Sequence, residues 1–141
     1  MSRKKTPPGG GKKGRTGPRG KSASKCQKCG SQCCRYITVK IPAPRTLRDF
    51  DGLLWQLAHE KVKAFRDARG WQLLVENLCR HLNGRGECAI YANRPITCRE
   101  HSSEYCEYDG PISETAAGFF DSYEKLDAYC RRRFATWDRR R

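Results

Sequence analysis

The chain has 141 residues, of which 31% are charged and 37% hydrophobic, and its formal net charge is +14. This length allows at most one ordinary domain, and no apolar run approaches the length of a membrane span, so no membrane association is expected. The excess positive charge lies in residues 1–25 and 131–141, whereas residues 26–130 are formally neutral. The charge therefore does not by itself indicate a nucleic-acid-binding domain.

Nine cysteines in a chain of this length have two competing explanations, disulfide bonds and metal ligands. A secreted disulfide scaffold begins with a signal peptide, whereas Met1 is followed by S-R-K-K-T-P-P-G-G-G, which contains no apolar segment. We therefore expect a cytoplasmic protein, in which reducing conditions favour metal-bound thiolates over disulfides. The odd number of cysteines also argues against complete pairing.

Residues 1–25 are rich in Gly, Pro, Lys and Arg and have no apolar periodicity. Such a composition buries too little surface to offset the entropy of ordering, so we expect a disordered basic tail. Two roles fit this tail: a solubilising extension with no partner, or weak attraction to nucleic acid or another acidic surface.

The first cysteine group, residues 26–34, has the sequence C-Q-K-C-G-S-Q-C-C. Cys26 and Cys29 form a C-x2-C pair, which lets a short turn bind one metal ion through two thiolates. Cys33 and Cys34 are adjacent, and adjacent side chains in extended backbone point to opposite faces. We therefore predict that these two thiols reach two different sites.

Three regular elements are predicted between the two cysteine groups. Residues 35–41 alternate and are rich in β-branched side chains, which predicts a short strand that ends at the prolines that follow. A helix is expected over 46–58, because apolar residues recur at helical spacing and Thr46 with Asp49 forms a capping pattern. Residues 60–76 are expected to form a hairpin that turns at Arg69-Gly70, with a helix over 60–69 as the alternative.

The second cysteine group comprises Cys79, Cys88, Cys98 and Cys106. Asn83-Gly84 and Gly86 predict a tight turn between the first two cysteines, and Pro95 predicts an end to regular structure just before the third. These loops have little apolar content. Bound metal is therefore expected to supply the stability that a core cannot supply there.

A terminal helix is predicted over 122–137 from its apolar spacing, with Asp121 and Glu124 as its N-terminal cap pattern. The arginines of residues 131–133 and 139–141 are expected to form a solvated helix end rather than a recognition surface. Cys130 lies on the apolar side of this helix, which predicts a buried thiol outside the ligand set.

The two cysteine groups together resemble the YkgJ-like cysteine-cluster family, which is named for a CxxCxxCC motif and described as a zinc- or iron-chelating domain. The resemblance spans about residues 26–109 and is most specific in the segment C88-A-I-Y-A-N-R-P-I-T-C98-R. It also includes the first cysteine group, Cys79 and His81-Leu82. The first group departs from the family name, because its spacing C-x2-C-x3-C-C is one residue longer.

The resemblance implies metal or iron–sulfur binding by eight cysteines, which suits two four-thiolate sites. The implied ligands are Cys26, Cys29, Cys33, Cys34, Cys79, Cys88, Cys98 and Cys106. Thiolate serves both Zn²⁺ and iron–sulfur clusters, so ligand type leaves the choice between them open. Some of the neighbouring cations are expected to donate hydrogen bonds to thiolate sulfurs; these are Lys28, Arg35, Arg80, Arg94 and Arg99. His81 and His101 are less suited as ligands while eight thiolates are available.

We therefore predict an α+β fold: a small, irregular, metal-organised domain with short strands, one hairpin and two to three helices. Residues 26–110 form the expected metal-binding domain, and residues 111–141 form a helical extension that packs on it. The predicted function is chelation of zinc or an iron–sulfur cluster, with a protein partner that the sequence does not identify. The alternatives are a cluster-dependent redox or methyl-transfer accessory enzyme and a nucleic-acid-binding zinc module that uses the basic tails. No methyltransferase activity is predicted, because no glycine-rich cofactor loop follows a strand.

Overall fold

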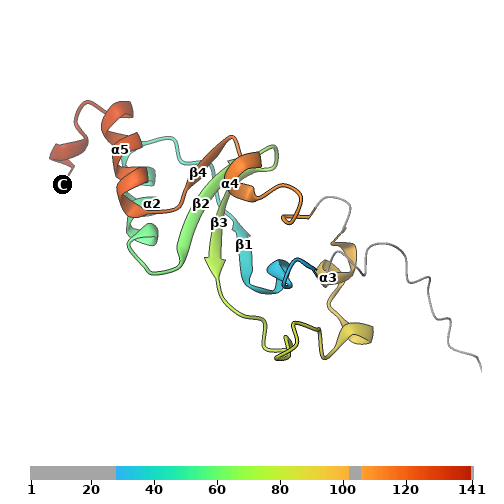
Figure 1. Ribbon diagram of the computed structural model, residues 1–141. Coiled ribbons are helices and arrows are strands. Elements are labelled where there is room, and N and C mark those ends of the chain that lie inside the picture. The colour runs from blue at the N-terminus through green and yellow to red at the C-terminus, as the bar shows by residue number, and fades with distance from the viewer. Residues whose placement is uncertain (1–27, 102–105, 141) are drawn as a thin grey trace, which may run out of the picture.

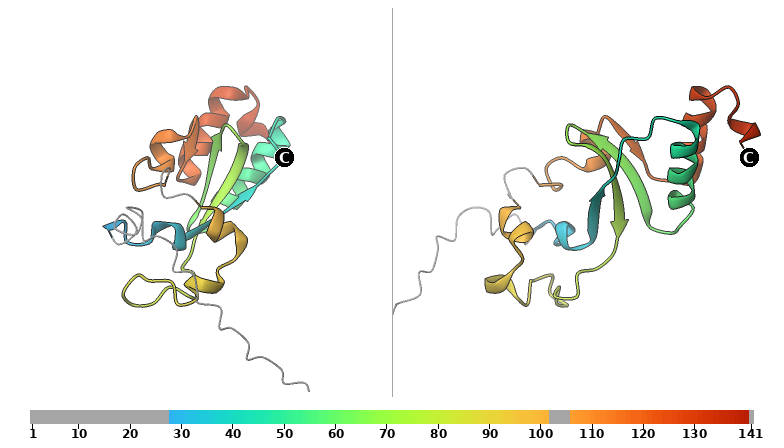
Figure 2. Two further views of the ribbon diagram at one scale, coloured as in Figure 1. Left: turned by 90° about the vertical axis from the view of Figure 1, so that its right-hand side faces the viewer. Right: turned by 180° about the vertical axis from the view of Figure 1, so that it is seen from behind.

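The computed structural model describes residues 28–101 and 106–140, so the tail predicted at 1–25 lies outside the described residues. Within them the chain has the predicted α+β fold, built on an antiparallel sheet with strand order β1-β3-β2-β4. The strands are β1 (Tyr36–Lys40), β2 (Val62–Asp67), β3 (Gly70–Glu76) and β4 (Gly118–Phe120). The helices are α2 (Leu47–Leu57), α3 (Ile96–Glu100), α4 (Ile112–Thr115) and α5 (Tyr123–Arg133). Helices α2 and α5 cover one face of the sheet, and α4 lies on the other (Figures 1 and 2).

Helix α2 begins with the predicted capping box. The Thr46 hydroxyl accepts a hydrogen bond from the Asp49 N–H at 3.2 Å, and the Asp49 carboxylate accepts one from the Thr46 N–H at 2.9 Å. These hydrogen bonds lower the pKa of the Asp49 carboxyl. The face of the helix that packs on the sheet consists of Phe50, Leu53, Leu54 and Leu57. The predicted helix over 46–58 is therefore confirmed to within a residue at each end.

The strand and hairpin predictions are also confirmed. Strand β1 lies antiparallel to β3, with Ile37 opposite Val75 and Val39 opposite Leu73. Strands β2 and β3 form the hairpin, and Gly70 has the positive φ of 111° that the turn requires. The alternative of a helix over 60–69 is therefore wrong.

Strand β4 was not predicted, and it places the C-terminal segment in the same sheet. Phe120 pairs with Ala64 of β2, and the Phe120 ring stacks on that of Trp71 with centroids 5.8 Å apart. Helix α5 follows at once and is capped by the Ser122 hydroxyl, which accepts from the Lys125 N–H at 3.3 Å. The cap is therefore one residue later than the predicted Asp121.

The terminal helix ends at Arg133, earlier than the predicted residue 137. The chain turns at Phe134 and continues into the short 3-10 helix η4 (Trp137–Arg139). This turn lets the Trp137 Nε1–H donate to the Asp127 carboxylate at 2.7 Å. A continuous helix would separate these two residues by about 15 Å along its axis, so the hydrogen bond requires the helix to end.

The arginines at 131–133 and Arg139 are exposed, as predicted, but two C-terminal arginines also make ion pairs within the molecule. Arg140 donates to Asp51 of α2 at 2.6 Å, and its guanidinium lies 4.0 Å from the centroid of the Trp137 ring. Arg131 donates to Asp127 at 2.7 Å. The Trp137 hydrogen bond and these cations hold the pKa of the Asp127 carboxyl below its usual range. Together they fasten η4 over α2 and α5.

The apolar core occupies only one end of the molecule. Every described residue that is fully buried falls within 50–74 or 120–137. The described parts of 28–49 and 75–119, which carry seven cysteines, contribute no fully buried side chain. In Figure 1 residues 28–35 and 77–101 lie at the end of the sheet away from α2 and α5. No helix within 28–101 and 106–140 has the length and apolar character to cross a membrane.

The burial of two tryptophans predicts that their substitution has very different effects on the free energy of unfolding. Trp137 is 1% exposed, whereas Trp55 on the outer face of α2 is 66% exposed. Replacing Trp137 with Ala is expected to reduce the free energy of unfolding by about 3–5 kcal/mol, because it empties a core site and removes the partner of Asp127. Trp55→Ala is the matched control and is expected to change it by less than about 0.5 kcal/mol. Urea unfolding of both variants measures this, and equal effects would show that η4 is not part of the core.

Candidate metal centre

The first cysteine group folds through two consecutive left-handed residues. Gly30 and Ser31 have φ values of 65° and 59°, and Ser31 caps the 3-10 helix η1 (Gln32–Cys34). Such a pair reverses the chain tightly, although the left-handed conformation is unfavourable for serine. This turn lies between Cys29 and Cys33, where the spacing is one residue longer than in the family name. The Ser31 hydroxyl then donates to the Gly86 carbonyl, which joins this turn to the second cysteine group.

The adjacent thiols of Cys33 and Cys34 lie side by side. Both residues belong to η1, so the backbone is helical rather than extended, and their side chains form a hydrogen bond with each other. The prediction that they point to opposite faces is therefore wrong, because it assumed extended backbone. Cys33 is exposed and Cys34 is half-buried.

Cys79 and Cys88 are held beside Cys34 by backbone hydrogen bonds. The Cys79 N–H donates to the Cys34 carbonyl at 2.8 Å, which extends the contact between β1 and β3 beyond the strands themselves. The chain then turns as predicted, with Gly86 at a φ of 77°, and Cys88 pairs with Leu82 in an antiparallel bridge. This loop therefore returns the chain, and Cys88 with it, toward the start of the second cysteine group.

Cys98 lies in the short helix α3, where the sequence had predicted no regular structure. Pro95 is the N-cap of this helix, with a φ of −52°. Proline is tolerated at a helix start, since the N–H that it lacks would have no helical partner there. In Figures 1 and 2, α3 lies at the same end of the molecule as η1.

Cys106 is held in a separate turn that is tied to β1. The Asp109 N–H donates to the Cys106 carbonyl at 3.0 Å, and the Cys106 thiol lies 3.9 Å from the Asp109 carboxylate. The next residue, Glu107, accepts a hydrogen bond from the Tyr36 hydroxyl. Burial and this hydrogen bond both raise the pKa of Tyr36, so it stays a donor at neutral pH.

The Cys34 thiol lies close to several other thiols. Its pKa is raised mainly by burial and further by the charges of three other thiols, and a hydrogen bond from Cys33 opposes the rise. The three are Cys79, Cys88 and Cys98. The structure thus brings thiols from η1, the Cys79–Cys88 loop and α3 within electrostatic reach of one another.

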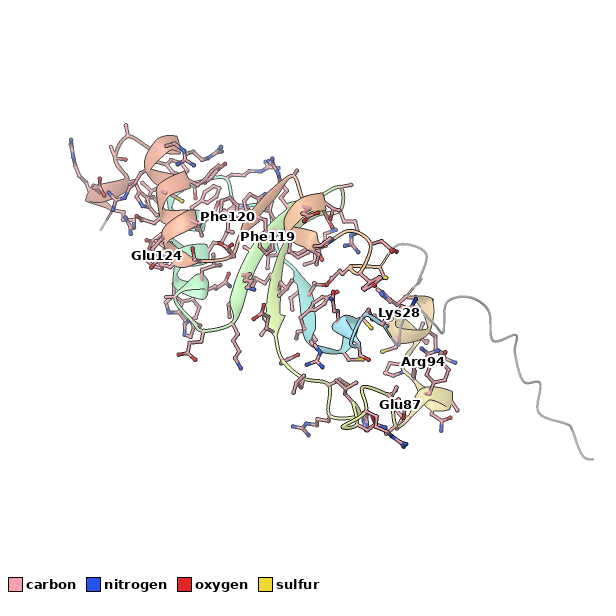
Figure 3. All side chains as sticks on the ribbon, viewed as in Figure 1. Lys28, Glu87, Arg94, Phe119, Phe120 and Glu124 are labelled. Atoms are coloured by element: carbon pink, nitrogen blue, oxygen red, sulfur yellow. The ribbon has the colours of Figure 1, made fainter. Side chains whose placement is uncertain are left out.

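Two of the five cations expected to bind sulfur donate to backbone carbonyls. Arg35 Nε donates to the Gly30 carbonyl at 2.9 Å, and Arg94 Nε donates to the Tyr91 carbonyl at 3.0 Å. The Arg94 guanidinium also stacks 3.8 Å from the centroid of the Tyr91 ring. Figure 3 shows Lys28, Glu87 and Arg94 at the cysteine-bearing end, far from Phe119, Phe120 and Glu124.

The donor chemistry fits zinc or iron, since thiolate is the ligand of structural zinc and of iron–sulfur clusters. Among the described residues, however, no three Cys, His, Asp or Glu side chains are arranged to hold one ion. Cys26, the first predicted ligand, lies outside the described residues. Binding would therefore require the thiols that are already neighbours to converge further.

Three residues that position the site were not predicted from the sequence. Ser31 joins the first cysteine group to the Gly86 turn, and Tyr36 with Glu107 joins β1 to the Cys106 turn. In the sequence, the C-x3-C-C spacing, which is one residue longer than in the family name, was the signal that could have pointed to a turn at Ser31.

Cys130 is fully buried in the core at the other end, as predicted, and burial raises the pKa of its thiol to about 11.

The sequence was compared with protein-family models, curated proteins and solved structures. No curated protein and no solved structure matches the chain. One family model, CxxCxxCC, matches residues 25–131, a span that runs from the first cysteine group into α5. The chain thus belongs to the CxxCxxCC family, whose description is a putative zinc- or iron-chelating domain.

Proposed function

We propose that the protein chelates zinc or an iron–sulfur cluster through eight cysteines, and that the metal stabilises the end of the molecule distant from the apolar core. The proposed ligands are Cys26, Cys29, Cys33, Cys34, Cys79, Cys88, Cys98 and Cys106. One observation carries the proposal: thiols from two distant parts of the chain gather around η1, where the described residues include no fully buried side chain.

Metal binding would supply stability where hydrophobic burial does not. Structural zinc in small peptides contributes about 10–16 kcal/mol of apparent free energy, much more than the few hydrogen bonds of these loops provide. A four-thiolate site carries a charge of about −2 with either Zn²⁺ or a [4Fe–4S]²⁺ cluster, so charge does not separate the two. The positive charges of the nearby arginines favour a site of this negative charge with either metal.

Metal analysis of protein purified without oxygen tests the proposal and distinguishes the two metals. Bound zinc gives a colourless protein, and an iron–sulfur cluster gives a brown one with sulfur-to-iron charge-transfer absorption. Protein that holds neither metal as purified, and that takes up neither zinc nor iron with sulfide under reducing conditions, would contradict it.

Metal removal is expected to affect the two ends of the molecule differently. The amides of residues 79–101 should lose protection from hydrogen exchange when a chelator removes the metal, because few other contacts hold these loops. The amides of α2 and α5 should keep their protection, because they pack in the apolar core. Hydrogen-exchange mass spectrometry before and after chelation measures this. Equal loss at both ends would show that the metal stabilises the whole domain.

Removal of the Tyr36 hydroxyl is expected to weaken metal binding about tenfold, because the outer partners of metal ligands typically contribute 10–100-fold. Tyr36→Phe removes the hydrogen bond to Glu107 and frees the Cys106 turn from β1. Tyr108→Phe is the matched control, since Tyr108 lies in the same turn with its side chain 46% exposed. Competition with a chromophoric zinc chelator measures both affinities. Equal affinities for the two variants would show that the Tyr36–Glu107 contact does not position a ligand.

A further inference from the structure

Strand β1 is an outer strand of the sheet within the described residues, and four of its five residues are exposed. At either end of β1, the Arg35 carbonyl and the Ile41 N–H form hydrogen bonds on the side of β3. Successive residues of an antiparallel strand direct their N–H and C=O groups to alternate sides. The even-numbered residues of β1 therefore direct theirs outward, away from β3; these are Tyr36, Thr38 and Lys40.

Two apolar side chains of β1 are exposed although they belong to the core face of the sheet. Val39 lies opposite Leu73, which packs against the buried core, and Ile37 lies on the same face two residues earlier. Their side chains are 45% and 51% exposed. An outer strand that combines unpaired backbone groups with exposed apolar side chains is a site where another strand can add.

The sequence of β1 is complementary to a second, antiparallel copy of itself. When two copies pair about Thr38, Ile37 of each copy lies opposite Val39 of the other. These apolar pairs occupy the positions without backbone hydrogen bonds, where opposite side chains approach most closely. The core face of one sheet then continues into that of the other, so the pairing covers the apolar side chains that β1 leaves exposed.

The charges on the opposite face of β1 favour the same pairing. The Tyr36 hydroxyl donates to the Glu107 carboxylate, so a negative charge lies at the end of the Tyr36 side chain. In the pairing about Thr38, the exposed Lys40 of the second copy lies opposite Tyr36. The Tyr36 ring and the Glu107 carboxylate both attract a cation there. Because the pairing is symmetric, this contact forms twice.

We propose that the chain forms a homodimer by antiparallel pairing of β1 with β1 of a second copy, centred on Thr38. This inference goes beyond metal binding and does not depend on it. Both copies use the same edge, and Pro42 and Pro44 follow β1, so the pairing closes as a dimer rather than extending into a fibre. Helix η1 precedes β1, so the cysteine groups of the two copies lie at opposite ends of the paired strands.

Sedimentation equilibrium of the full-length chain tests the dimer, under reducing conditions that prevent disulfides between exposed cysteines. A strand of five residues gives a small interface, so the wild type is expected to dimerise with increasing concentration. Thr38→Pro removes an outward N–H and is expected to weaken association about thirtyfold, because each copy loses one backbone hydrogen bond. Thr38→Val keeps this N–H and is the matched control, which should associate as the wild type does.

Charge variants of the apolar pair test the register. Ile37→Lys/Val39→Lys places like charges opposite each other in the dimer and should give a monomer. Ile37→Lys/Val39→Glu places opposite charges there and should associate at least about tenfold more strongly than the first variant. Fluorescence of Trp71 and Trp137, which lie in the core, reports whether each variant remains folded. If Thr38→Pro unfolds, the charge variants decide.

Three results would overturn the proposal. The first is a wild-type chain that stays monomeric up to its solubility limit, and the second is a dimer that Ile37→Lys/Val39→Lys or folded Thr38→Pro leaves intact. The third is equal association of the two charge variants, which would contradict pairing about Thr38. None of these results bears on metal binding, which the metal content of the same samples measures separately.

Discussion

The antiparallel pairing of β1 with β3 determines where the two cysteine groups meet. The pairing begins inside the core, where Ile41 and Leu73 pack against the buried cluster, and it continues past the ends of both strands. Beyond Tyr36 and Glu76 the same contact persists as the hydrogen bond between the Cys79 N–H and the Cys34 carbonyl. Strand β1 itself buries no side chain, so its register, and with it the position of Cys34, is held by its backbone pairing with β3.

Local chemistry made much of the fold predictable. The capping box of Thr46 and Asp49, the alternation in β1 and the glycine turn of the hairpin each depend on residues close together in sequence. Strand β4 is different: three residues are too few to show alternation, and its pairing with β2 joins segments more than fifty residues apart. The early end of α5 likewise depends on the hydrogen bond from Trp137 back to Asp127. Helical spacing alone cannot reveal such a reversal of the chain.

The candidate site was predictable in composition but not in arrangement. The residue type and spacing of the cysteines indicated metal ligands, and seven of the eight predicted ligands lie in the described residues outside the core. Their grouping depends on Ser31, Tyr36 and Glu107, whose hydrogen bonds cross 55 to 71 residues of sequence. The adjacent cysteines show the difference clearly. Their separation along the chain is known from the sequence, but the direction of their side chains depends on the helical backbone of η1.

The electrostatics of Cys34 explain how such a site can form before metal binds. Four or more thiolates close together would repel one another, whereas burial and the neighbouring thiols raise the pKa of Cys34 and so favour its neutral form. A neutral Cys34 thiol adds no charge to the group, and a bound cation would then replace its proton. The loops therefore need only weak hydrogen bonds to keep the thiols near one another. These loops extend from the paired strands β1 and β3, which lie next to the apolar core, so the cysteines come together without being fully buried.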